Sequence, residues 1–426
     1  MTKNKIDILV LGGGGREHAL AWKIAQSPEC GALYCAPGNG GTEGVAENVA
    51  LDPCDPAAVV AFCRDKNIGL AVIGPEAPLV AGVSDALAAA DIPAFGASAA
   101  AAQLEASKRF TKSLCAEAGI PTAAAGDFDT AEAAHEYVRD HSLPVVVKAD
   151  GLAAGKGVVI AETHEAAHEA IDRMFDGAFG AAGAAVVIEE FMTGVEASFF
   201  VLCDGTHALP LATAQDYKRV GEGDTGLNTG GMGAISPAPA MTQERIAETM
   251  AHIIAPTLDT MRARGTPYRG VLYAGLMVGE AGVKLVEYNC RFGDPECQVL
   301  MPRLKSDIVP ALHAAATGTL DGLTLDWDDA AAITIVMAAQ GYPEKYESGT
   351  EIRNLGAEGE HVIFHAGTSR ADGTLRATGG RVLNMTASGK TLAEARAKAY
   401  AGLQAIDWPQ GFYRRDIGRG IGDDAG

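Results

Sequence analysis

Three polar side chains stand at every second position of the segment VEYNCRFGDPE, residues 286–296. The segment reads as a β-strand, and because strand side chains alternate between two faces, Glu287 and Asn289 point to the same side. Arg291 follows on that side if the strand persists. Carboxylate and amide oxygens are ligands that Mg²⁺ accepts together with phosphate oxygens and water, and a guanidinium can hold a carboxylate or phosphate oxygen during a transfer reaction. We therefore predict that Glu287 and Asn289 bind a divalent metal ion beside a catalytic Arg291.

A glycine-rich hairpin offers a place for phosphate groups. In VVVKADGLAAGKGVVI, Lys148 ends an apolar strand, and Gly151, Gly155 and Gly157 lie in the loop before a second apolar strand. The loop is not a Walker A motif, because Asp150 stands where that motif needs a glycine. Glycines let backbone N–H groups approach phosphate oxygens, and the lysine adds a positive charge. The pattern thus predicts a phosphate-binding hairpin, with an ordinary flexible hairpin as the alternative.

Acidic residues mark the end of a later strand. The segment VIEEFMTGVEAS places Glu189 and Glu190 at the strand end and Glu196 shortly after it. A strand edge followed by a hinge can bind adenine through backbone groups, while a carboxylate takes ribose hydroxyls. Solvated surface carboxylates are the alternative interpretation of this segment.

The segment 216–239 combines charged side chains with a glycine cluster. On a chain of net charge −20, Lys218 and Arg219 beside a loop rich in donors indicate a pocket for a small anionic substrate. A solvated charged surface is the alternative, which the glycine cluster disfavours. The residues of the candidate pocket are Asp216, Lys218, Arg219, Asn228, Thr229, Gly230, Gly231 and Gly233.

Two further patterns do not support a function. In GGGGREHA the third glycine of a dinucleotide fingerprint is replaced, by Glu17 or by His18 depending on where the motif is taken to start. The turn can still present N–H groups to an anion. The sequence HEAAH, from His164 to His168, matches a zinc-protease pattern, but no third ligand is suggested nearby, so we interpret it as a chance match.

The composition restricts partners and location. The 426 residues suggest roughly three domains, and the net charge of −20 argues against binding to nucleic acid or to a membrane surface. No uninterrupted apolar stretch is long enough to cross a bilayer. The eight cysteines include no C-x-x-C pair, so neither a zinc ribbon nor a disulfide scaffold fits. We expect a soluble, cytoplasmic protein with reduced thiols.

The order of predicted elements gives an α/β and α+β multidomain chain. Repeated strand–loop–helix units predict a parallel α/β domain over residues 1–105. A second domain follows over residues 106–325 and contains a smaller unit at about 122–195. Short strands and a helix make up a C-terminal domain over residues 326–426. Three helices are expected to begin at the N-caps Ser107, Asp129 and Thr391.

Four motifs, GGGGREHAL, KADGLAAGKGV, GDTGLNTGGMGA and NCRFGDPE, follow one another along the chain. The lysine hairpin, the acidic strand end and the Glu-x-Asn strand resemble those of ATP-grasp ligases. The four motifs are similar to signatures of the phosphoribosylamine–glycine ligase family, also called glycinamide ribonucleotide synthetases, and the likeness spans essentially the whole chain. Two departures are visible, since the family commonly has His at Tyr217 and Pro at Leu227.

The resemblance implies a division of labour among the residues. The middle domain would be an ATP-grasp core with the unit at 122–195 as its lid, and Mg²⁺ or Mn²⁺ would lie on Glu287 and Asn289. The nucleotide would contact Lys108, Lys148, Gly151, Glu189, Glu190, Phe191, Met192 and Glu196. Arg291 and Lys218 would be catalytic, and Arg291 and Asp294 would join the residues of segment 216–239 in the substrate site.

The resemblance also implies a reaction in purine biosynthesis. ATP would phosphorylate glycine, and 5-phosphoribosylamine would attack the glycyl phosphate, giving glycinamide ribonucleotide, ADP and phosphate. We expect a monomer, although the sequence leaves an oligomer open. The nearest alternative is another ATP-grasp enzyme, for example a carboxylase that forms carboxyphosphate. A regulatory nucleotide-binding protein without turnover is the alternative from a different class, and the cluster at Glu287, Asn289 and Arg291 argues against it.

Overall fold

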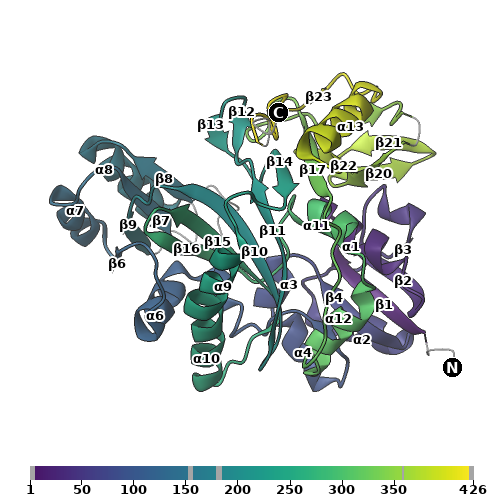
Figure 1. The fold of residues 1–426 in the computed structure, drawn as a ribbon, viewed down its shortest axis with the longest axis horizontal. Helices are drawn as coiled ribbons and strands as arrows, with labels where there is room; N and C mark the ends of the chain where they lie inside the picture. The colour runs from purple at the N-terminus through teal and green to yellow at the C-terminus, as the bar shows by residue number, and fades with distance from the viewer. Residues whose placement is uncertain (1–4, 152–156, 179–184, 357–358, 422–426) are drawn as a thin grey trace.

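The computed structural model describes residues 5–151, 157–178, 185–356 and 359–421, and Figure 1 shows how their helices and strands are arranged. The N-terminal domain holds a parallel sheet of order β3-β2-β1-β4-β5. Its strands are β1 (Ile6–Gly12), β2 (Cys30–Pro37), β3 (Glu47–Asn48), β4 (Ile68–Ile73) and β5 (Ala94–Phe95). Its helices are α1 (Gly15–Ile24), α2 (Pro56–Asp65), α3 (Glu76–Val80), α4 (Val83–Ala89) and α5 (Gln103–Ala106).

Strand β1 shows why this sheet is buried on both sides. Leu9 and Leu11 enter one hydrophobic cluster, and Ile8 and Val10 enter another. All four side chains are fully buried. An apolar run without alternation is expected for a parallel strand that has cover on both faces.

The lid is a separate small unit with its own core. Helix α6 (Lys108–Ala118) leads into a four-stranded antiparallel sheet of order β6-β9-β7-β8. The strands are β6 (Ala125–Phe128), β7 (Val145–Ala149), β8 (Val158–Ala161) and β9 (Val186–Glu190), with helices α7 (Ala131–Arg139) and α8 (His164–Arg173), the latter followed by a single wider turn at Met174–Ala178. The buried residues of its hydrophobic cluster lie between 134 and 188, and the lid projects from the rest of the molecule at the left of Figure 1.

A nine-stranded sheet joins the middle of the chain to its C-terminal part. Its order is β16-β15-β10-β11-β14-β17-β22-β19, and β23 pairs with β17. The strands are β10 (Val195–Asp204), β11 (Ala208–Asp216), β14 (Gly233–Ser236), β15 (Arg269–Gly279), β16 (Gly282–Asn289), β17 (Ala331–Ala339), β19 (His361–His365), β22 (Arg381–Gly389) and β23 (Gly411–Phe412). Strands β14 and β17 pair directly, so one sheet contains strands from both sides of the domain boundary predicted between residues 325 and 326. That domain boundary stays a prediction.

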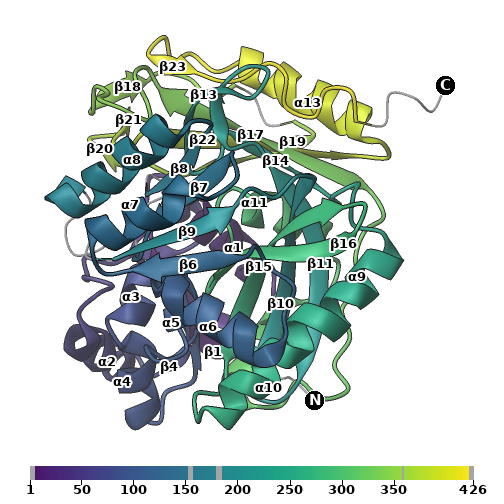
Figure 2. The same cartoon turned by 90° about the vertical axis from the view of Figure 1, so that its left-hand side faces the viewer.

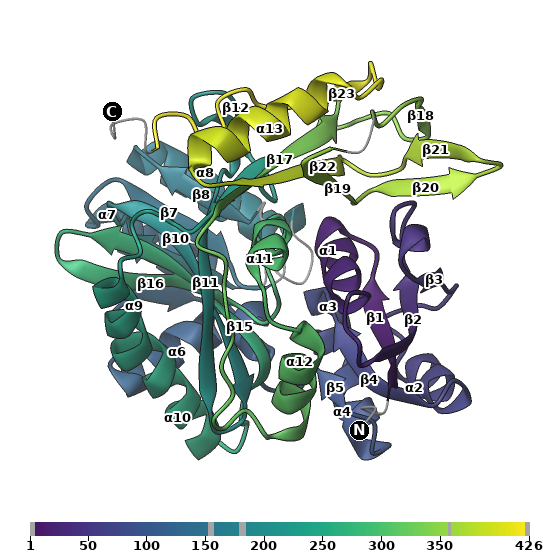
Figure 3. The ribbon, with the colours of Figure 1, turned by 45° about the vertical axis from the view of Figure 1, so that its right-hand side comes forward.

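The remaining elements cover this sheet or extend from it. Helices α9 (Gln243–Thr249), α10 (Ala255–Ala263), α11 (Cys297–Arg303) and α12 (Ile308–Thr317) belong to the middle of the chain, and α13 (Leu392–Gln404) packs on β17 and β22. Strands β12 (Arg219–Gly221) and β13 (Thr225–Asn228) form a hairpin, and β18 (Thr350–Ile352), β21 (Thr374–Ala377) and β20 (Thr368–Ala371) form a small sheet in that order. Figure 3 shows α13 above β17 and β22, with the N-terminal domain beneath them.

The predicted fold class is confirmed, with a parallel α/β domain, a core with a lid, and short C-terminal strands with one long helix. Two of the three predicted N-caps are also confirmed, since Ser107 Oγ accepts the Phe110 N–H and Thr391 Oγ1 accepts the Glu394 N–H. The third was wrong. Thr130 caps α7, because the Asp129 carboxylate is bound by Arg109 instead. Within the described ranges, no helix combines the length and the apolar character needed to cross a membrane.

One glycine contact between the N-terminal domain and the core predicts a stability effect. Gly270 in β15 has φ +105°, and a Cβ placed there would lie 3.0 Å from the Cα of Gly96. We expect Gly270→Ala to lower the free energy of unfolding by about 2–3 kcal/mol, because backbone strain and the contact act together. Gly265→Ala is the control, since Gly265 has φ +76° but no heavy atom within 4 Å of a built Cβ. Calorimetry should show a clearly lower melting temperature for Gly270→Ala than for Gly265→Ala. Equal shifts in both variants would show that the contact with Gly96 does not contribute.

Candidate active site

Arg291 is fixed by carboxylates of the N-terminal domain. Its Nε lies 3.2 Å from Oε2 of Glu76 in α3, and its Nη2 lies 3.0 Å from Oε1 of Glu105 in α5. Nη2 also donates to Oδ1 of Asn289 at 3.1 Å. Burial alone would lower the pKa of Arg291, but Glu105 and Glu76 raise it well above its usual value. The guanidinium is therefore permanently charged and held in one orientation. The sequence analysis identified neither of the two carboxylates.

The predicted metal ligands lie at the end of β16. Asn289 stands opposite Tyr273 of β15 and Glu287 stands opposite Gly275, where a register shift interrupts the ladder. An irregularity of this kind re-aims side chains at the edge of a site. Glu287 also lies near Lys108, since its charge opposes the lowering of the Lys108 pKa by burial. Both oxygen donors thus occupy the same end of one strand, next to a lysine.

This donor set fits a metal ion that arrives with phosphate. A carboxylate and an amide oxygen are acceptable to Mg²⁺ and leave most of an octahedron to other oxygens. Across the part of the chain that the structure describes, no group of three or more His, Cys, Asp or Glu could hold a metal ion. His164 and His168 of the HEAAH pattern are among these described residues and belong to no such group. A cation on Glu287 and Asn289 would therefore need oxygens from a bound phosphate group.

A lysine of the lid and a lysine of α6 share one buried carboxylate. Lys148 Nζ lies 2.7 Å from Oε2 of Glu189, and Lys112 Nζ lies 3.1 Å from Oε1 of the same residue. Glu189 is 3% exposed, so both of its oxygens are occupied by ammonium groups inside the protein. Glu189 holds Lys148 in place, which differs from a direct contact with a nucleotide.

The start of the predicted phosphate loop faces Lys108. Lys108 Nζ donates to the carbonyl oxygen of Gly151 at 3.2 Å, and Gly151 has φ +137°, a conformation that favours glycine. Gly155 lies outside the described residues. Lys108 comes from α6 and Gly151 from the end of β7, so the structure brings these two predicted nucleotide residues together.

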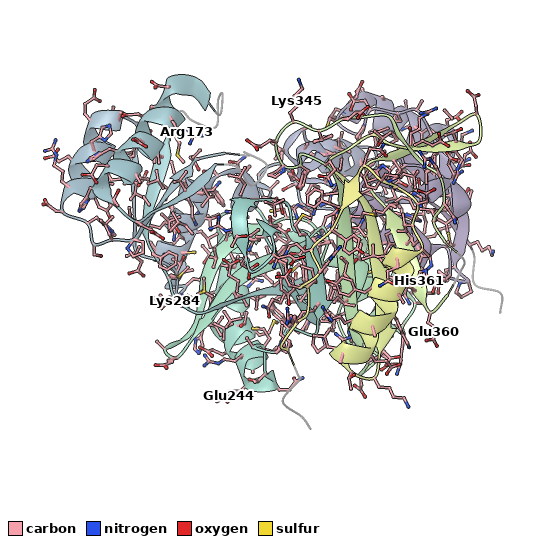
Figure 4. The ribbon with its side chains drawn as sticks, turned by 90° about the horizontal axis from the view of Figure 1, so that it is seen from above. Arg173, Glu244, Lys284, Lys345, Glu360 and His361 are labelled. Atoms are coloured by element: carbon pink, nitrogen blue, oxygen red, sulfur yellow. The ribbon has the colours of Figure 1, made fainter. Side chains whose placement is uncertain are left out.

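The predicted adenine-binding segment connects the lid to the core. Glu190 ends β9, and Phe191 and Met192 follow it before β10 begins. Glu190 pairs with Lys284 at 3.3 Å, and Figure 4 shows Lys284 on the core and Arg173 on the lid. Phe191 is 39% exposed, an unusual value for a large apolar side chain, and Met192 is partly exposed. An open apolar surface at this link suits a planar ring.

Lys218 lies between two acidic side chains. Its ammonium group contacts the Glu196 carboxylate of β10 and lies 3.5 Å from Oδ1 of Asp216 in β11. Lys218 lowers the pKa of Glu196, while burial raises that of Asp216. Glu196, predicted to bind ribose, is thus joined to the predicted catalytic lysine. The three residues form one charge cluster at the edge of β10 and β11.

Glu296 is a site residue that the sequence analysis missed, although it lies in the opening segment. Oε1 of Glu296 accepts a hydrogen bond from Tyr273 Oη at 3.0 Å, and Ser198 Oγ lies 2.8 Å from the same hydroxyl. Burial and the nearby charge of Asp216 raise the pKa of Glu296 to about 7. No spacing rule identified it, because Tyr273 and Asp216 meet it only in the folded chain.

The backbone N–H groups of the glycine loop at residues 229–232 all donate hydrogen bonds to other groups of the protein. The N–H groups donate as follows: Thr229 to Lys218 O (2.8 Å), Gly230 to Tyr342 Oη (3.2 Å), Gly231 to Thr229 Oγ1 (2.9 Å) and Met232 to Tyr217 O (2.7 Å). These four groups are therefore not available to an anion in this conformation, which the sequence analysis did not foresee. A charged substrate would have to be bound by side chains around the loop.

The other predicted residues of segment 216–239 frame this loop. Arg219 and Asn228 face each other across the hairpin of β12 and β13, and Arg219 Nη1 donates to the Gly226 carbonyl oxygen at 2.8 Å. Gly233 opens β14 opposite Ile335 of β17. The loop therefore connects the hairpin of β12 and β13 to strand β14 of the nine-stranded sheet.

Asp294 joins three parts of the chain. Its Oδ2 accepts the Arg16 N–H of the N-terminal domain at 3.2 Å, and its Oδ1 accepts Nε2 of Gln298 in α11 at 2.9 Å. Arg381 of β22 pairs with Oδ1 at 3.3 Å. Arg381 also lowers the pKa of Asp294 against the effect of burial. Asp294 was predicted to line the substrate site, and here both oxygens are occupied by protein groups.

The glycine turn before α1 is closed by Glu17. Its Oε2 accepts the Gly14 N–H at 2.6 Å and its Oε1 lies 2.5 Å from Arg16 Nε. A Cβ built on Gly12 would lie 2.6 Å from Glu17 Cγ. The carboxylate therefore occupies the helix N-terminus, where a dinucleotide would place its pyrophosphate.

Three family models match the chain in consecutive segments. They are described as Phosphoribosylglycinamide synthetase, N domain, over residues 6–105; ATP-grasp (A) domain, over residues 106–297; and C domain, over residues 332–420. Together they account for most of the chain.

Relatives match over nearly the full length. The Phosphoribosylamine--glycine ligase of Mesorhizobium japonicum is 60% identical and covers 97% of this chain and 98% of its own. A chloroplastic one from Arabidopsis thaliana is 52% identical, covering 95% and 78%. The crystal structure of Phosphoribosylamine--glycine ligase from Thermotoga maritima has a TM-score of 0.85 at 34% identity, covering 96% and 100%. Biotin carboxylase from Campylobacter jejuni, at 15% identity and TM-score 0.73 over 97% and 94%, shows the fold alone. The chain belongs to the phosphoribosylglycinamide synthetase family of ATP-grasp ligases.

Proposed function

We propose that this chain joins glycine to 5-phosphoribosylamine through a glycyl phosphate, giving glycinamide ribonucleotide, ADP and phosphate. As a member of its family it is an ATP-dependent ligase of purine biosynthesis, and the family implies a divalent metal ion. The observation that carries the proposal is the placement of Arg291, locked by Glu76 and Glu105, beside the oxygen donors Glu287 and Asn289.

The nucleotide would lie between the lid and the core. Lys108, Lys148 and Gly151 would contact phosphates, the segment 190–192 the adenine and Glu196 the ribose. Glu287 and Asn289 would hold Mg²⁺ or Mn²⁺, which would draw phosphate oxygens together and offset their charge. Glu189 would act by positioning Lys148, since its oxygens are taken by Lys148 and Lys112.

Arg291 suits the first step. Glycine's carboxylate oxygen would form a bond to the γ-phosphorus while the bond from that phosphorus to the bridging oxygen of ADP breaks. A guanidinium already fixed by two carboxylates can orient the glycine carboxylate and stabilise developing charge without reorganising. Lid closure over the phosphates would keep water away from the acyl phosphate.

The second step forms the amide bond. The amine nitrogen of 5-phosphoribosylamine would attack the acyl carbon, the bond from that carbon to the phosphate oxygen would break, and the departing phosphate would take the amine proton. Lys218, held by Glu196 and Asp216, would offset the charge that develops on the acyl oxygen. Arg219, Asn228, Gly233 and Asp294, together with the loop 229–232, would frame the amine substrate.

The setting of the reaction follows from the same relatives. We propose that the chain acts as a monomer on small molecules in the cytoplasm. The Arabidopsis thaliana relative carries the word chloroplastic in its name, so fractionation is the direct check of location.

Omitting each substrate in turn tests the function. ADP formation should need glycine, and phosphate release should continue only when freshly made 5-phosphoribosylamine is present. Bicarbonate in place of glycine should give no ADP, because a carboxylase would form carboxyphosphate instead. ADP formation that follows bicarbonate, or none with all substrates present, would refute the proposal.

Arg291→Ala should lose about 3 kcal/mol of transition-state stabilisation, or roughly a hundredfold in kcat/KM. Arg291→Lys should keep the positive charge and the fold but recover only part of the activity, because lysine lacks the planar fork. Arg262→Ala, which removes an exposed arginine paired with Asp259 at 2.7 Å, is the matched control. Near-normal turnover of Arg291→Ala in a folded protein would contradict the assigned role.

The pH dependence of stability should report on Glu296. Its pKa is raised from 4.5 to about 7, so the native state keeps a proton that the unfolded chain has lost between these values. Its contribution is complete below pH 4.5 and is lost as pH rises through 7. Glu296→Gln should therefore flatten the fall in melting temperature between pH 5 and pH 8.

Glu360→Gln is the surface control for this measurement. Glu360 lies beside α13 in Figure 4 and pairs with Lys398 at 3.2 Å. That variant should keep the slope of the wild type. An unchanged slope in Glu296→Gln would mean that another group determines the pH dependence.

A further inference from the structure

Arg381 contacts the glycine loop and the turn after Arg291 with the same guanidinium. Its Nη1 donates to the carbonyl oxygens of Gly230 (2.5 Å), Gly231 (3.3 Å) and Asp294 (2.6 Å). Its Nη2 lies 3.3 Å from Oδ1 of Asp294. The side chain is 20% exposed, so most of it is enclosed by these partners. A residue of the C-terminal strand β22 thus links two segments of the candidate substrate site.

A second C-terminal residue, Tyr342, binds the same glycine through its N–H. Tyr342 Oη accepts the N–H of Gly230 at 3.2 Å, while Arg381 binds its carbonyl oxygen. A Cβ built on Gly230 would lie 3.0 Å from Arg381 Cζ, so a side chain there would push the guanidinium out of its present place. Glycines gain the most conformational freedom when they are released, so a loop of this composition depends on such external bonds.

The residues predicted to bind the nucleotide do not contact the C-terminal strands through these bonds. Lys148 is bound to Glu189, Lys108 to Gly151 and Glu190 to Lys284, all within the lid and the core. Figure 1 shows the lid on the left and β20, β21 and α13 at the upper right, and Figure 2 shows α13 again at the top of the molecule. The C-terminal contacts therefore concern the substrate loop and the Asp294 turn rather than the nucleotide.

We propose that Arg381 is a positioning residue for the phosphorylated amine, the substrate of the second step. It sets the loop at Gly230 and Gly231 against Asp294, and through them the surroundings of Lys218, whose carbonyl oxygen accepts the Thr229 N–H at 2.8 Å. This inference rests on the proposed function. It predicts that the two half-reactions depend differently on the hydrogen bonds of Arg381. The reaction of ATP with glycine would proceed without these bonds, whereas binding of the amine would need them.

Two variants and two assays test this separation. Positional isotope exchange in ATP with glycine alone reports the first step, and steady-state kinetics report KM for 5-phosphoribosylamine. Arg381→Ala should leave the exchange rate within about twofold and raise that KM by about ten- to a hundredfold, the scale of hydrogen bonds to a charged group. Arg381→Lys should restore part of the loss. A parallel fall in both assays would reduce Arg381 to a structural role, and an unchanged KM would refute the proposal.

Failure of the proposed function would look different. If the wild type shows no glycine-dependent exchange and forms no ADP with glycine, the reaction itself is misassigned. If the wild type ligates normally and Arg381→Ala binds the amine as well as the wild type does, only the role of Arg381 is lost.

A matched arginine and a double variant complete the test. Arg376 of β21 donates to the Gly349 carbonyl oxygen at 3.1 Å, so Arg376→Ala removes an arginine–glycine bond in the same domain and should change neither assay. Tyr342→Phe should also raise KM for the amine. Because both residues hold Gly230, the double variant should lose less than the product of the single losses. Fully multiplicative losses would show that the two residues do not act on a common loop conformation.

Discussion

The site depends on one cation, the half-buried guanidinium of Arg291, and on the two carboxylates that compensate it. Enclosing most of a charged group is costly unless it has partners, and Glu76 and Glu105 supply them from α3 and α5. The N-terminal domain has its own glycine turn filled by Glu17. We infer that it serves the site through these anchors, which orient Arg291 beside Asn289. The parallel sheet and the metal strand are thereby joined at the point where the chemistry is proposed.

The same logic of compensated charge extends across the rest of the site. Two lysines of the candidate site are already paired with carboxylates: Lys148 with Glu189, and Lys218 with Glu196 and Asp216. Lys108 instead donates to the carbonyl oxygen of Gly151. Bound phosphates would share these ammonium groups with the carboxylates, and a divalent metal ion would supply the remaining positive charge. Burial and the charge of Asp216 raise the pKa of Glu296, which adds a protonatable group beside this cluster.

Much of this arrangement could be predicted from local sequence, and the failures share a cause. Alternation along a strand was enough to group Glu287, Asn289 and Arg291, and side-chain capping identified Ser107 and Thr391. Asp129 was mistaken for an N-cap because its partner, Arg109, lies twenty residues away. Glu76, Glu105, Tyr342 and Arg381 were not identified for the same reason, since each acts on a residue far along the chain. The N–H groups of the loop 229–232 were wrongly expected to be available to an anion. Glycine content indicates backbone conformational freedom, whereas tertiary contacts decide which N–H groups have no partner within the protein.

The continuous sheet explains why the C-terminal strands can influence a loop of the ATP-grasp core. The loop at 229–232 leads directly into β14, and β14 pairs with β17, which pairs in turn with β22. Arg381 begins β22, so its guanidinium and the end of the loop are set by one ladder of backbone hydrogen bonds. Among the described residues, the strands of the lid form a sheet of their own with a separate hydrophobic cluster, and one isolated bridge, from Thr122 to Leu285, joins the start of the lid to β16. We infer that the lid can move as a unit over a bound nucleotide, while the continuous sheet fixes the loop at 229–232 where the amine is proposed to bind.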